Sequence, residues 1–487
     1  MVMRVLGVSS LTRDLGRWRD DDDGRRKSAR PAYQALAEAI RLLIHDGRVP
    51  LGVALPSERD LATGLSLSRT TITSTYSVLR EDGYLISRQG SRSTVALPSG
   101  AARSGNMIHI RTDVDAPVVE MSSAALPAPP EMEGAYGAAL QALPAYLTSH
   151  GMEPIGLAVL REAIADRYRQ RGLPTEPDQI MVTLGAQHAL SLLLAALIGP
   201  GDRVLIEHPT YPNAIEAIRH SGARPVPVPI RPEEGWDLDG IRTAARQTAA
   251  RLAYMIPDFH NPTGLCMSDE GRAELARIAR ETRMTVIVDE SMAELNLDIE
   301  QRTPVAAFAR GAEVITIGSA SKSFWGGLRV GWIRARPSLI TRVAGTRSAV
   351  DLGTPVMDQL ATADLLGSAS TILAARHDLL RRQRSALLDE LELQLPEWRP
   401  MPGPGGMSLW IQLPTPVSTA LAATAPNFGV LLAAGPRFGV EGAFERFVRL
   451  PYTHNEVTLR AAVSGVAAAY GALSPRSDEA TAALVCV

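Results

Sequence analysis

An alternation of short apolar runs with helical patterns, beginning near residue 122, is the feature that most constrains the fold. The apolar runs have the length of buried strands and lie at residues 179–183, 203–207, 251–256, 285–289 and 313–317. Helical patterns lie between them, at residues 156–171, 187–198, 211–221 and 268–283. This alternation predicts an α/β domain with a mainly parallel sheet. Ligands bind beyond the carboxyl ends of such strands, so the residues that follow each strand are the first site candidates.

Two of these strand ends carry residues suited to a flat, phosphorylated ligand. Gly185, Ala186 and Gln187 open a helix, where small residues let backbone N–H groups approach a phosphate. Tyr211 follows the second strand and can place its ring beside a flat ligand. Taken singly, each is equally typical of an ordinary strand-to-helix turn or loop.

The next two strand ends carry side chains that can hold a heteroaromatic ring. Asn261, in an Asn-Pro-Thr-Gly turn, can hydrogen-bond a ring hydroxyl or phenolate. Asp289 ends the fourth strand, and a carboxylate there can hold a protonated ring nitrogen.

A lysine follows the fifth strand, in a chain that has only two lysines among its 50 basic residues. Lys27 lies in a highly charged stretch, where it reads as a solvated surface charge. Lys322 is a candidate nucleophile, because a Schiff base needs an amine that can lose its proton and arginine cannot supply one. Ser319, Ser321 and Arg329 surround it in sequence and can reach a phosphate.

The first hundred residues have a different character, with a net charge of +4 against −6 for the rest. Ser57 and Ser68 are suited to cap two short helices joined by a turn that contains Gly64, a helix-turn-helix pattern. A β-like pair at residues 84–88 and 93–97 then predicts a wing. Arg69, Thr70 and Thr71, at the start of the second helix, and Arg88, beside the tip of the wing, are the expected DNA contacts.

We therefore expect a multidomain chain with five parts. They are a disordered tail (1–30), a winged helix-turn-helix (31–96), a linker (97–121), an α/β domain (122–473) and a disordered C-terminal tail (474–487).

The run LPSERDLATGLSLSRTTITSTYSVLREDGYLISRQGS resembles the winged helix of the GntR family of bacterial transcription regulators. The Pro-Ser-Glu-Arg start, the Ser-Arg-x-Thr start and the wing glycine occur in family order. The resemblance implies that Arg59 and Gly90, together with Arg69 and Thr71, contact DNA. The alternative is a small helical module that binds another protein.

The larger domain resembles the fold type I aminotransferase family, whose members use pyridoxal 5′-phosphate, over about residues 122–472. The resemblance implies that Lys322 forms the Schiff base, Asp289 contacts the pyridine nitrogen, Asn261 contacts the ring oxygen and Tyr211 stacks on the ring. Arg449 would grip a substrate or effector carboxylate. The phosphate would be held by Gly185, Ala186, Gln187, Ser319, Ser321 and Arg329.

One departure from this family concerns a tyrosine that usually follows the strand-end aspartate by two or three residues. Ser291 and Met292 stand there, and neither can place a phenol on the cofactor's ring oxygen. The loss is expected to weaken transamination without preventing cofactor binding.

A GntR-like winged helix followed by an aminotransferase-like body resembles the MocR/GabR subfamily of transcription regulators. The resemblance implies pyridoxal phosphate as cofactor, and double-stranded operator DNA and a small amino effector as partners. It also implies a head-to-tail homodimer. Cofactor or effector binding would change the body's conformation and, through it, the hold of the heads on DNA.

Two alternatives stay open. One is an active aminotransferase with an ancillary DNA-binding head, and the other is a cofactor-free regulator that uses the fold as a dimerisation scaffold. The recognition-helix sequence and the missing tyrosine favour a regulator without physiological turnover, although an aminotransferase-like half-reaction stays open. The presence of Lys322, Asp289 and Asn261 argues against the cofactor-free alternative.

No apolar stretch is long enough to span a membrane, and Cys266 and Cys486 form no disulfide framework. We therefore expect a cytoplasmic protein without a membrane partner. The sequence identifies neither the effector, the operator, the target genes nor the direction of regulation.

Overall fold

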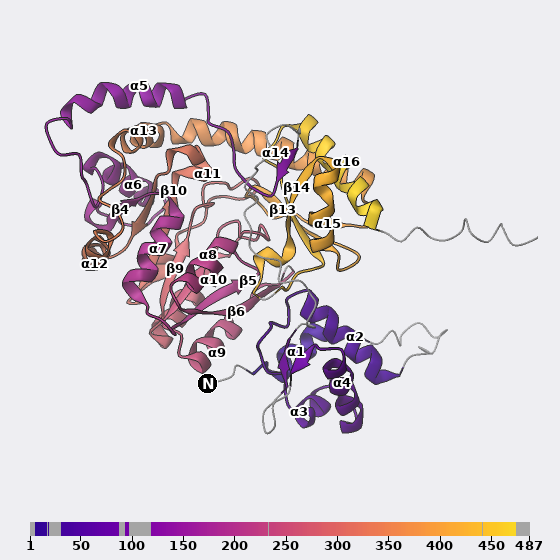
Figure 1. The fold of residues 1–487 in the computed structure, drawn as a ribbon. Coiled ribbons are helices and arrows are strands. Elements are labelled where there is room, and N and C mark those ends of the chain that lie inside the picture. Colours follow the sequence, from indigo (N-terminus) through magenta and orange to yellow (C-terminus); the bar gives the residue numbers. More distant parts are fainter. Residues whose placement is uncertain are drawn as a thin grey trace, which may run out of the picture.

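The computed structural model describes residues 5–16, 18, 31–86, 93–96, 118–231, 233–440 and 442–473. An N-terminal head of short helices lies against a larger body that contains two sheets (Figure 1). Within the described ranges, no helix combines the length and the apolar character needed to cross a membrane.

The head is a winged helix-turn-helix. Ser57 and Ser68 accept hydrogen bonds from the backbone N–H groups of Asp60 and Thr71, so both predicted helix caps are confirmed. The elements of the head are α1 (Val8–Leu15), α2 (Ala32–His45), α3 (Glu58–Gly64), α4 (Arg69–Glu81), β1 (Leu85–Ile86) and β2 (Thr94–Val95). Strands β1 and β2 pair antiparallel and form the base of the wing.

The prediction that residues 1–30 form a disordered tail is wrong for residues 5–16, which include helix α1. Leu11 and Leu15 are spaced by one helical turn, and both are buried in the apolar core of the head together with Leu6. The dense charges farther along this segment obscured that short apolar pattern. Residues 19–30 lie outside the described part of the chain.

The body is built around an eight-stranded sheet of order β4-β11-β10-β9-β8-β5-β6-β7. Strands β10, β9, β8, β5 and β6 are parallel, as the alternation predicts, and β11 runs antiparallel between β10 and β4. The strands are β4 (Ile180–Thr183), β5 (Arg203–His208), β6 (Arg224–Arg231), β7 (Gly235–Trp236), β8 (Leu252–Met255), β9 (Thr285–Asp289), β10 (Val314–Ser319) and β11 (Gly331–Arg334).

Helices cover this sheet on both faces, so its central strands are buried (Figure 1). The helices of this region are α5 (Met132–Ala142), α6 (Ala158–Gln170), α7 (Ala186–Leu197), α8 (Pro212–His220), α9 (Leu238–Thr248), α10 (Asp269–Thr282), α11 (Ala320–Ser323), α12 (Pro337–Arg347) and α13 (Val356–Gly367).

A second, five-stranded sheet has the order β12-β13-β15-β14-β3 and brings the start of the body next to its end. Its strands are β3 (Val119–Met121), β12 (Arg399–Met401), β13 (Ser408–Gln412), β14 (Val430–Ala434) and β15 (Phe447–Pro451). The accompanying helices are α14 (Ala369–Gln394), α15 (Ser418–Thr424) and α16 (Glu456–Leu473).

Candidate functional site

A cavity of about 510 Å³ lies at the carboxyl ends of the parallel strands. Its volume falls within the range of about 300–1,000 Å³ that is typical of small-molecule sites. Predicted residues that line it are Ala186, Gln187, Tyr211, Asn261, Asp289, Ser319, Ser321, Lys322, Arg329 and Arg449. Loops after five different strands therefore bring nearly every predicted body residue to one place.

Lys322 lies in α11, one turn beyond the end of β10. Its Nζ donates a hydrogen bond of 2.6 Å to the carbonyl oxygen of Ala124, in the segment that follows β3. Burial, reinforced by the positive charge of Arg449, lowers the pKa of Lys322 to about 8, while Asp289 acts in the opposite direction. The amine is therefore neutral far more readily than an exposed lysine.

A cradle for an anion forms where α7 begins. Gly185 has φ +82° at the N-cap of α7, and an added Cβ there would lie 3.0 Å from Nη2 of Arg329. Arg329 Nη2 also donates to the carbonyl oxygen of Leu184. The Oγ of Ser321, which can donate a hydrogen bond, is buried without a partner among the described residues. This hydroxyl, the guanidinium and the helix N-terminus fit a phosphate. Gln187 lines the cavity, but its Nε2 donates to the carbonyl oxygen of Asn213.

A second group of contacts in the cavity wall is organised around Asp289. Its Oδ2 accepts a hydrogen bond of 2.6 Å from the hydroxyl of Tyr254, and its Oδ1 accepts one of 2.9 Å from the N–H of Ser291. These bonds hold a carboxylate in the cavity wall, where it can face a ring nitrogen. Sequence reasoning missed Tyr254, because every residue of strand β8 is buried and no alternation marks which side chain faces a ligand.

Tyr211 and Asn261 are also held by polar partners. The hydroxyl of Tyr211 accepts a hydrogen bond of 2.9 Å from Nδ2 of Asn213. Oδ1 of Asn261 accepts one of 3.3 Å from Nη1 of Arg449. Both side chains line the cavity, so each can contact a bound ring.

The two residues that replace the expected tyrosine both line the cavity. Met292 is buried and offers no hydrogen bond, and the Oγ of Ser291 has no partner among the described residues. Tyr254 does not substitute for the missing phenol, because its hydroxyl is committed to Asp289.

Arg449 comes from β15 and is buried. Its Nη2 donates to the carbonyl oxygen of Ser122, and its guanidinium lies 5.0 Å from the ring centroid of Phe438. Burial, with a smaller contribution from the charge of Arg437, lowers the pKa of Arg449 to about 10. The side chain is nevertheless charged at neutral pH and is suited to a carboxylate.

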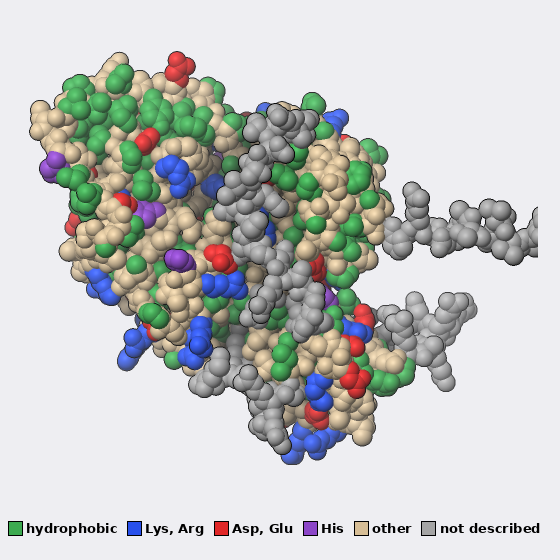
Figure 2. All heavy atoms as spheres, viewed as in Figure 1, with side chains coloured by type: hydrophobic (Ala, Val, Ile, Leu, Met, Phe, Trp, Pro, Cys, Tyr) green, Lys and Arg blue, Asp and Glu red, His purple; other side chains and the backbone are tan. Residues whose placement is uncertain are grey.

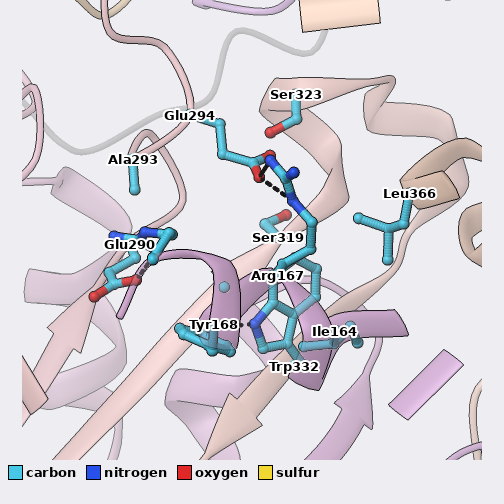
Figure 3. Close-up of a pocket in the computed structure, with 12 residues that line it drawn as sticks. Ile164, Arg167, Tyr168, Glu290, Ala293, Glu294, Ser319, Ser323, Trp332 and Leu366 are labelled. Atoms are coloured by element: carbon cyan, nitrogen blue, oxygen red, sulfur yellow. Dashed lines mark hydrogen bonds and ion pairs between the residues drawn. The ribbon is translucent and has the colours of Figure 1, made fainter. Parts of the chain in front are cut away.

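A second, much smaller cavity of about 20 Å³ is also lined by Ser319 (Figure 3). Arg171 donates to Glu290 at 2.6 Å in its wall, and Arg167 forms an ion pair with Glu294 at 2.5 Å. The cavity has room for about one water molecule and none for a cofactor. Because Glu290 directly follows Asp289, the buried ion pair with Arg171 helps to fix the end of β9.

Four of the predicted DNA contacts lie in the described part of the head, in α3 and at the start of α4. Arg59 and Arg69 are exposed and form no ion pair with any described residue. The hydroxyls of Thr70 and Thr71 lie 2.8 and 2.7 Å from Oγ of Ser68, so both are held beside the residue that caps α4. Arg88 and Gly90 lie outside the described residues.

The head also contacts the body close to the large cavity. The N–H of Phe444 donates to the carbonyl oxygen of His45 at 2.8 Å, and Nδ1 of His208 lies 3.3 Å from the carbonyl oxygen of Gly47. Gly47 has φ +71°, and an added Cβ would overlap the ring of Phe444. We refer to these residues as the head–body interface.

A buried ion pair extends the head–body interface to α1. Nε of Arg231, at the end of β6, lies 2.8 Å from Oδ1 of Asp14, and both side chains are at most 5% exposed. Nη2 of Arg231 also donates to Oγ of Ser10 at 3.1 Å. The segment expected to be a tail is thus part of the contact between head and body.

A winged helix joined to an α/β domain with these strand-end residues defines a fold type I pyridoxal-phosphate protein with a DNA-binding head. The model of aminotransferase class I and II matches residues 139–466, and the model of the bacterial regulatory proteins of the gntR family matches residues 32–95. The chain belongs to the class I and II aminotransferase family, and with its GntR head it has the domain arrangement of the MocR/GabR regulators. The family indicates pyridoxal 5′-phosphate as cofactor.

Curated relatives include transcriptional regulators and a transaminase. An uncharacterized HTH-type transcriptional regulator, YdcR of Escherichia coli (strain K12), is 27% identical, covering 86% of this chain and 94% of the relative. YisV of Bacillus subtilis (strain 168), with the same description, is 26% identical over 79% and 85%. The 2-aminoadipate transaminase of Thermus thermophilus is 32% identical over 61% of this chain and 75% of its own length.

Among solved structures, the α-aminoadipate aminotransferase LysN of Thermus thermophilus superposes with a TM-score of 0.67 at 29% identity. The match covers 73% of this chain and 92% of that one. That structure is a complex with N-(5′-phosphopyridoxyl)-L-leucine.

Proposed function

We propose that pyridoxal phosphate bound through Lys322, together with an amino compound bound beside it, sets how tightly this GntR-type regulator holds its operator DNA. The observation that carries the proposal is the joining of a lysine of lowered pKa, an anion cradle and Asp289 in one cavity. When bound, the cofactor supplies a carbonyl carbon to which amines attach covalently and reversibly. The body would thereby become a sensor of amino compounds.

A continuous piece of chain supports coupling between the cavity and the head. Residues 435–447 contribute Phe438, which lies beneath the guanidinium of Arg449 in the cavity, and Phe444, which contacts the head. His208 ends β5 three residues before Tyr211, and its Nε2 accepts a hydrogen bond from the N–H of Val440. A ligand that shifts either segment would therefore change contacts that position the head.

A homodimer is the second part of the proposal. Large apolar side chains are exposed on α5 and just beyond it, including Leu140 and Leu147 at 63% and 69%, and Figure 2 shows apolar side chains gathered over this region. A second copy of the chain is the occupant that we propose for this face, because a dimer would present two winged helices to two half-sites.

Sedimentation equilibrium tests the homodimer. The wild-type protein is expected to have twice the mass of one chain, and the Leu140→Asp variant is expected to have a lower mass than the wild type. A monomer at micromolar concentration would contradict this part.

The alternative, an active aminotransferase, is disfavoured by Ser291 and Met292. Without a phenol on the cofactor's ring oxygen, the chain lacks one means of tuning proton transfer at Lys322. Steady-state turnover of an amino donor and a 2-oxo acid at ordinary enzyme rates, about 1–10³ s⁻¹, would favour the enzyme over the regulator.

The lowered pKa of Lys322 predicts how cofactor loading depends on pH. Only the neutral amine attacks the cofactor carbonyl, and its fraction rises about tenfold per pH unit below the pKa. We expect the rate at which the cofactor-free chain regains visible absorption to increase with pH up to about 8, the pKa of Lys322, and then to level off. A rate that continues to rise to about pH 10, as for an exposed lysine, would contradict this assignment.

Arg69 tests the DNA-binding face. Arg69→Ala removes an exposed cation at the start of α4, so operator affinity is expected to fall and the salt slope of log K to decrease by about one. The matched control is Arg382→Ala, which removes another exposed arginine, from α14 of the body. Titrations at several salt concentrations that give the same slope for both variants would exclude Arg69 from the interface.

A further inference from the structure

A second arginine lines the large cavity beside Arg449. Arg437 lies between β14 and β15, in the short 3-10 helix Gly435–Phe438, and was not among the residues that sequence reasoning selected. Its Nε is buried without a hydrogen-bond partner, and its guanidinium forms no ion pair with any residue in the described ranges. A half-buried guanidinium facing a cavity with unused donors is costly unless a ligand satisfies it.

One carboxylate in the cavity wall, that of Glu120, acts electrostatically on Arg437 without bonding to it. Glu120 lines the cavity, but its Oε1 accepts hydrogen bonds from the N–H and the Oγ of Ser122, at 2.7 and 2.5 Å. Burial lowers the pKa of Arg437, and the charge of Glu120 acts in the opposite direction, although Glu120 is not within 4.0 Å of the guanidinium. The charge of Glu120 thus partly offsets the cost of burying the charged guanidinium of Arg437, but Glu120 accepts no hydrogen bond from its N–H groups.

The other charged groups of the cavity have partners in the proposed function. Arg329 faces the phosphate cradle, Asp289 faces the ring nitrogen, Lys322 bonds to the cofactor, and Arg449 receives the carboxylate next to the reacting amine. Among the described residues that line the cavity, Arg437 remains as the one cation without an assigned anion.

Resting on the proposed function, we propose that the effector is a dicarboxylic amino compound, whose side-chain carboxylate binds Arg437 while its α-carboxylate binds Arg449. Both arginines line the cavity, Arg449 from β15 and Arg437 from the short 3-10 helix that precedes β15. A side-chain carboxylate at Arg437 would also act on the segment that carries Phe444 to the head–body interface, seven residues farther on. The same segment of chain would then select the effector and transmit its binding to the head.

The test compares isosteric pairs of amino acids on the full-length, cofactor-loaded chain. Dissociation constants for L-aspartate against L-asparagine, and for L-glutamate against L-glutamine, are measured from the change in visible absorption. For at least one pair, we expect the dicarboxylic member to bind about 10- to 100-fold more tightly than its amide. Arg437→Gln is expected to bring that ratio close to one, and Arg437→Lys to leave an intermediate ratio.

Arg382→Gln, which changes an exposed arginine on α14, serves as the control and should keep the wild-type ratio. Thermal unfolding of each variant shows whether it is folded. A ratio near one in the wild-type chain, or an Arg437→Gln variant that keeps the wild-type ratio, would overturn the inference. If no amino acid of either kind changes the absorption, the proposed sensing function itself fails, which is a different outcome.

Discussion

Lys322→Arg is expected to abolish covalent attachment of pyridoxal phosphate while keeping the positive charge and most of the length of the side chain. The guanidinium does not lose its proton at any pH a protein tolerates, so it cannot attack the cofactor carbonyl. The purified variant should lack the visible absorption of the lysine-bound cofactor. Borohydride should fix no cofactor to it, and the response of operator binding to amino compounds should disappear.

The chain supplies its own control, because it has only one other lysine. Lys27→Arg is the same chemical change at that position and should leave the absorption and borohydride fixation unchanged. Lys322→Ala should behave like Lys322→Arg with respect to covalent attachment. Fixation of the cofactor in both Lys322 variants would show that another group binds it.

Gly47→Ala is expected to separate DNA binding from ligand response. The added methyl group would overlap the ring of Phe444, which is 2% exposed and packed against the rings of His208, Trp410 and Phe447. Because that ring has no space to move into, the head must shift, at a cost of about 1–3 kcal/mol typical of overpacking. We expect operator binding to persist while ligands change the operator dissociation constant by less than about twofold.

Gly52→Ala is the matched control for backbone strain. Gly52 also lies in the head with positive φ, +75° against +71° for Gly47, but an added Cβ there meets nothing within 4 Å. Both variants carry the strain of an alanine in the left-handed region, about 1–2 kcal/mol, and only Gly47→Ala disturbs the head–body interface. Equal loss of the ligand response in both variants would indicate strain rather than a role of the interface.

The sequence was most informative where local chemistry and chain order agree. Cap residues such as Ser57 and Ser68 are local signals, and the structure confirms both. The parallel strands of the body follow from the alternation of patterns. Because parallel strands end at one edge of a sheet, residues as distant as Tyr211 and Lys322 could be expected to meet in one cavity.

What sequence reasoning missed depends on tertiary contacts or on unusual composition. Strand β6 contains Pro225, Pro227 and Pro229, and proline within an apolar run argues against a strand. The three prolines occupy alternate positions, so the backbone sites that lack an N–H all lie on one edge of the strand. Tyr254 lies in a fully buried strand and Arg437 in a short 3-10 helix, and in neither does any periodicity indicate a ligand. Their importance became visible only when the fold placed them in the wall of the cavity.

The central claim is that ligand state in the body controls operator affinity of the head. Its most direct test is the dissociation constant for operator DNA, located by footprinting on upstream DNA, at one fixed salt concentration. It should be measured for the cofactor-free chain, the cofactor-loaded chain and the loaded chain with L-aspartate or L-glutamate. The account predicts a change of at least about fivefold between two of these states, and no such change in Lys322→Arg. One dissociation constant for all states of the wild-type chain would contradict the account.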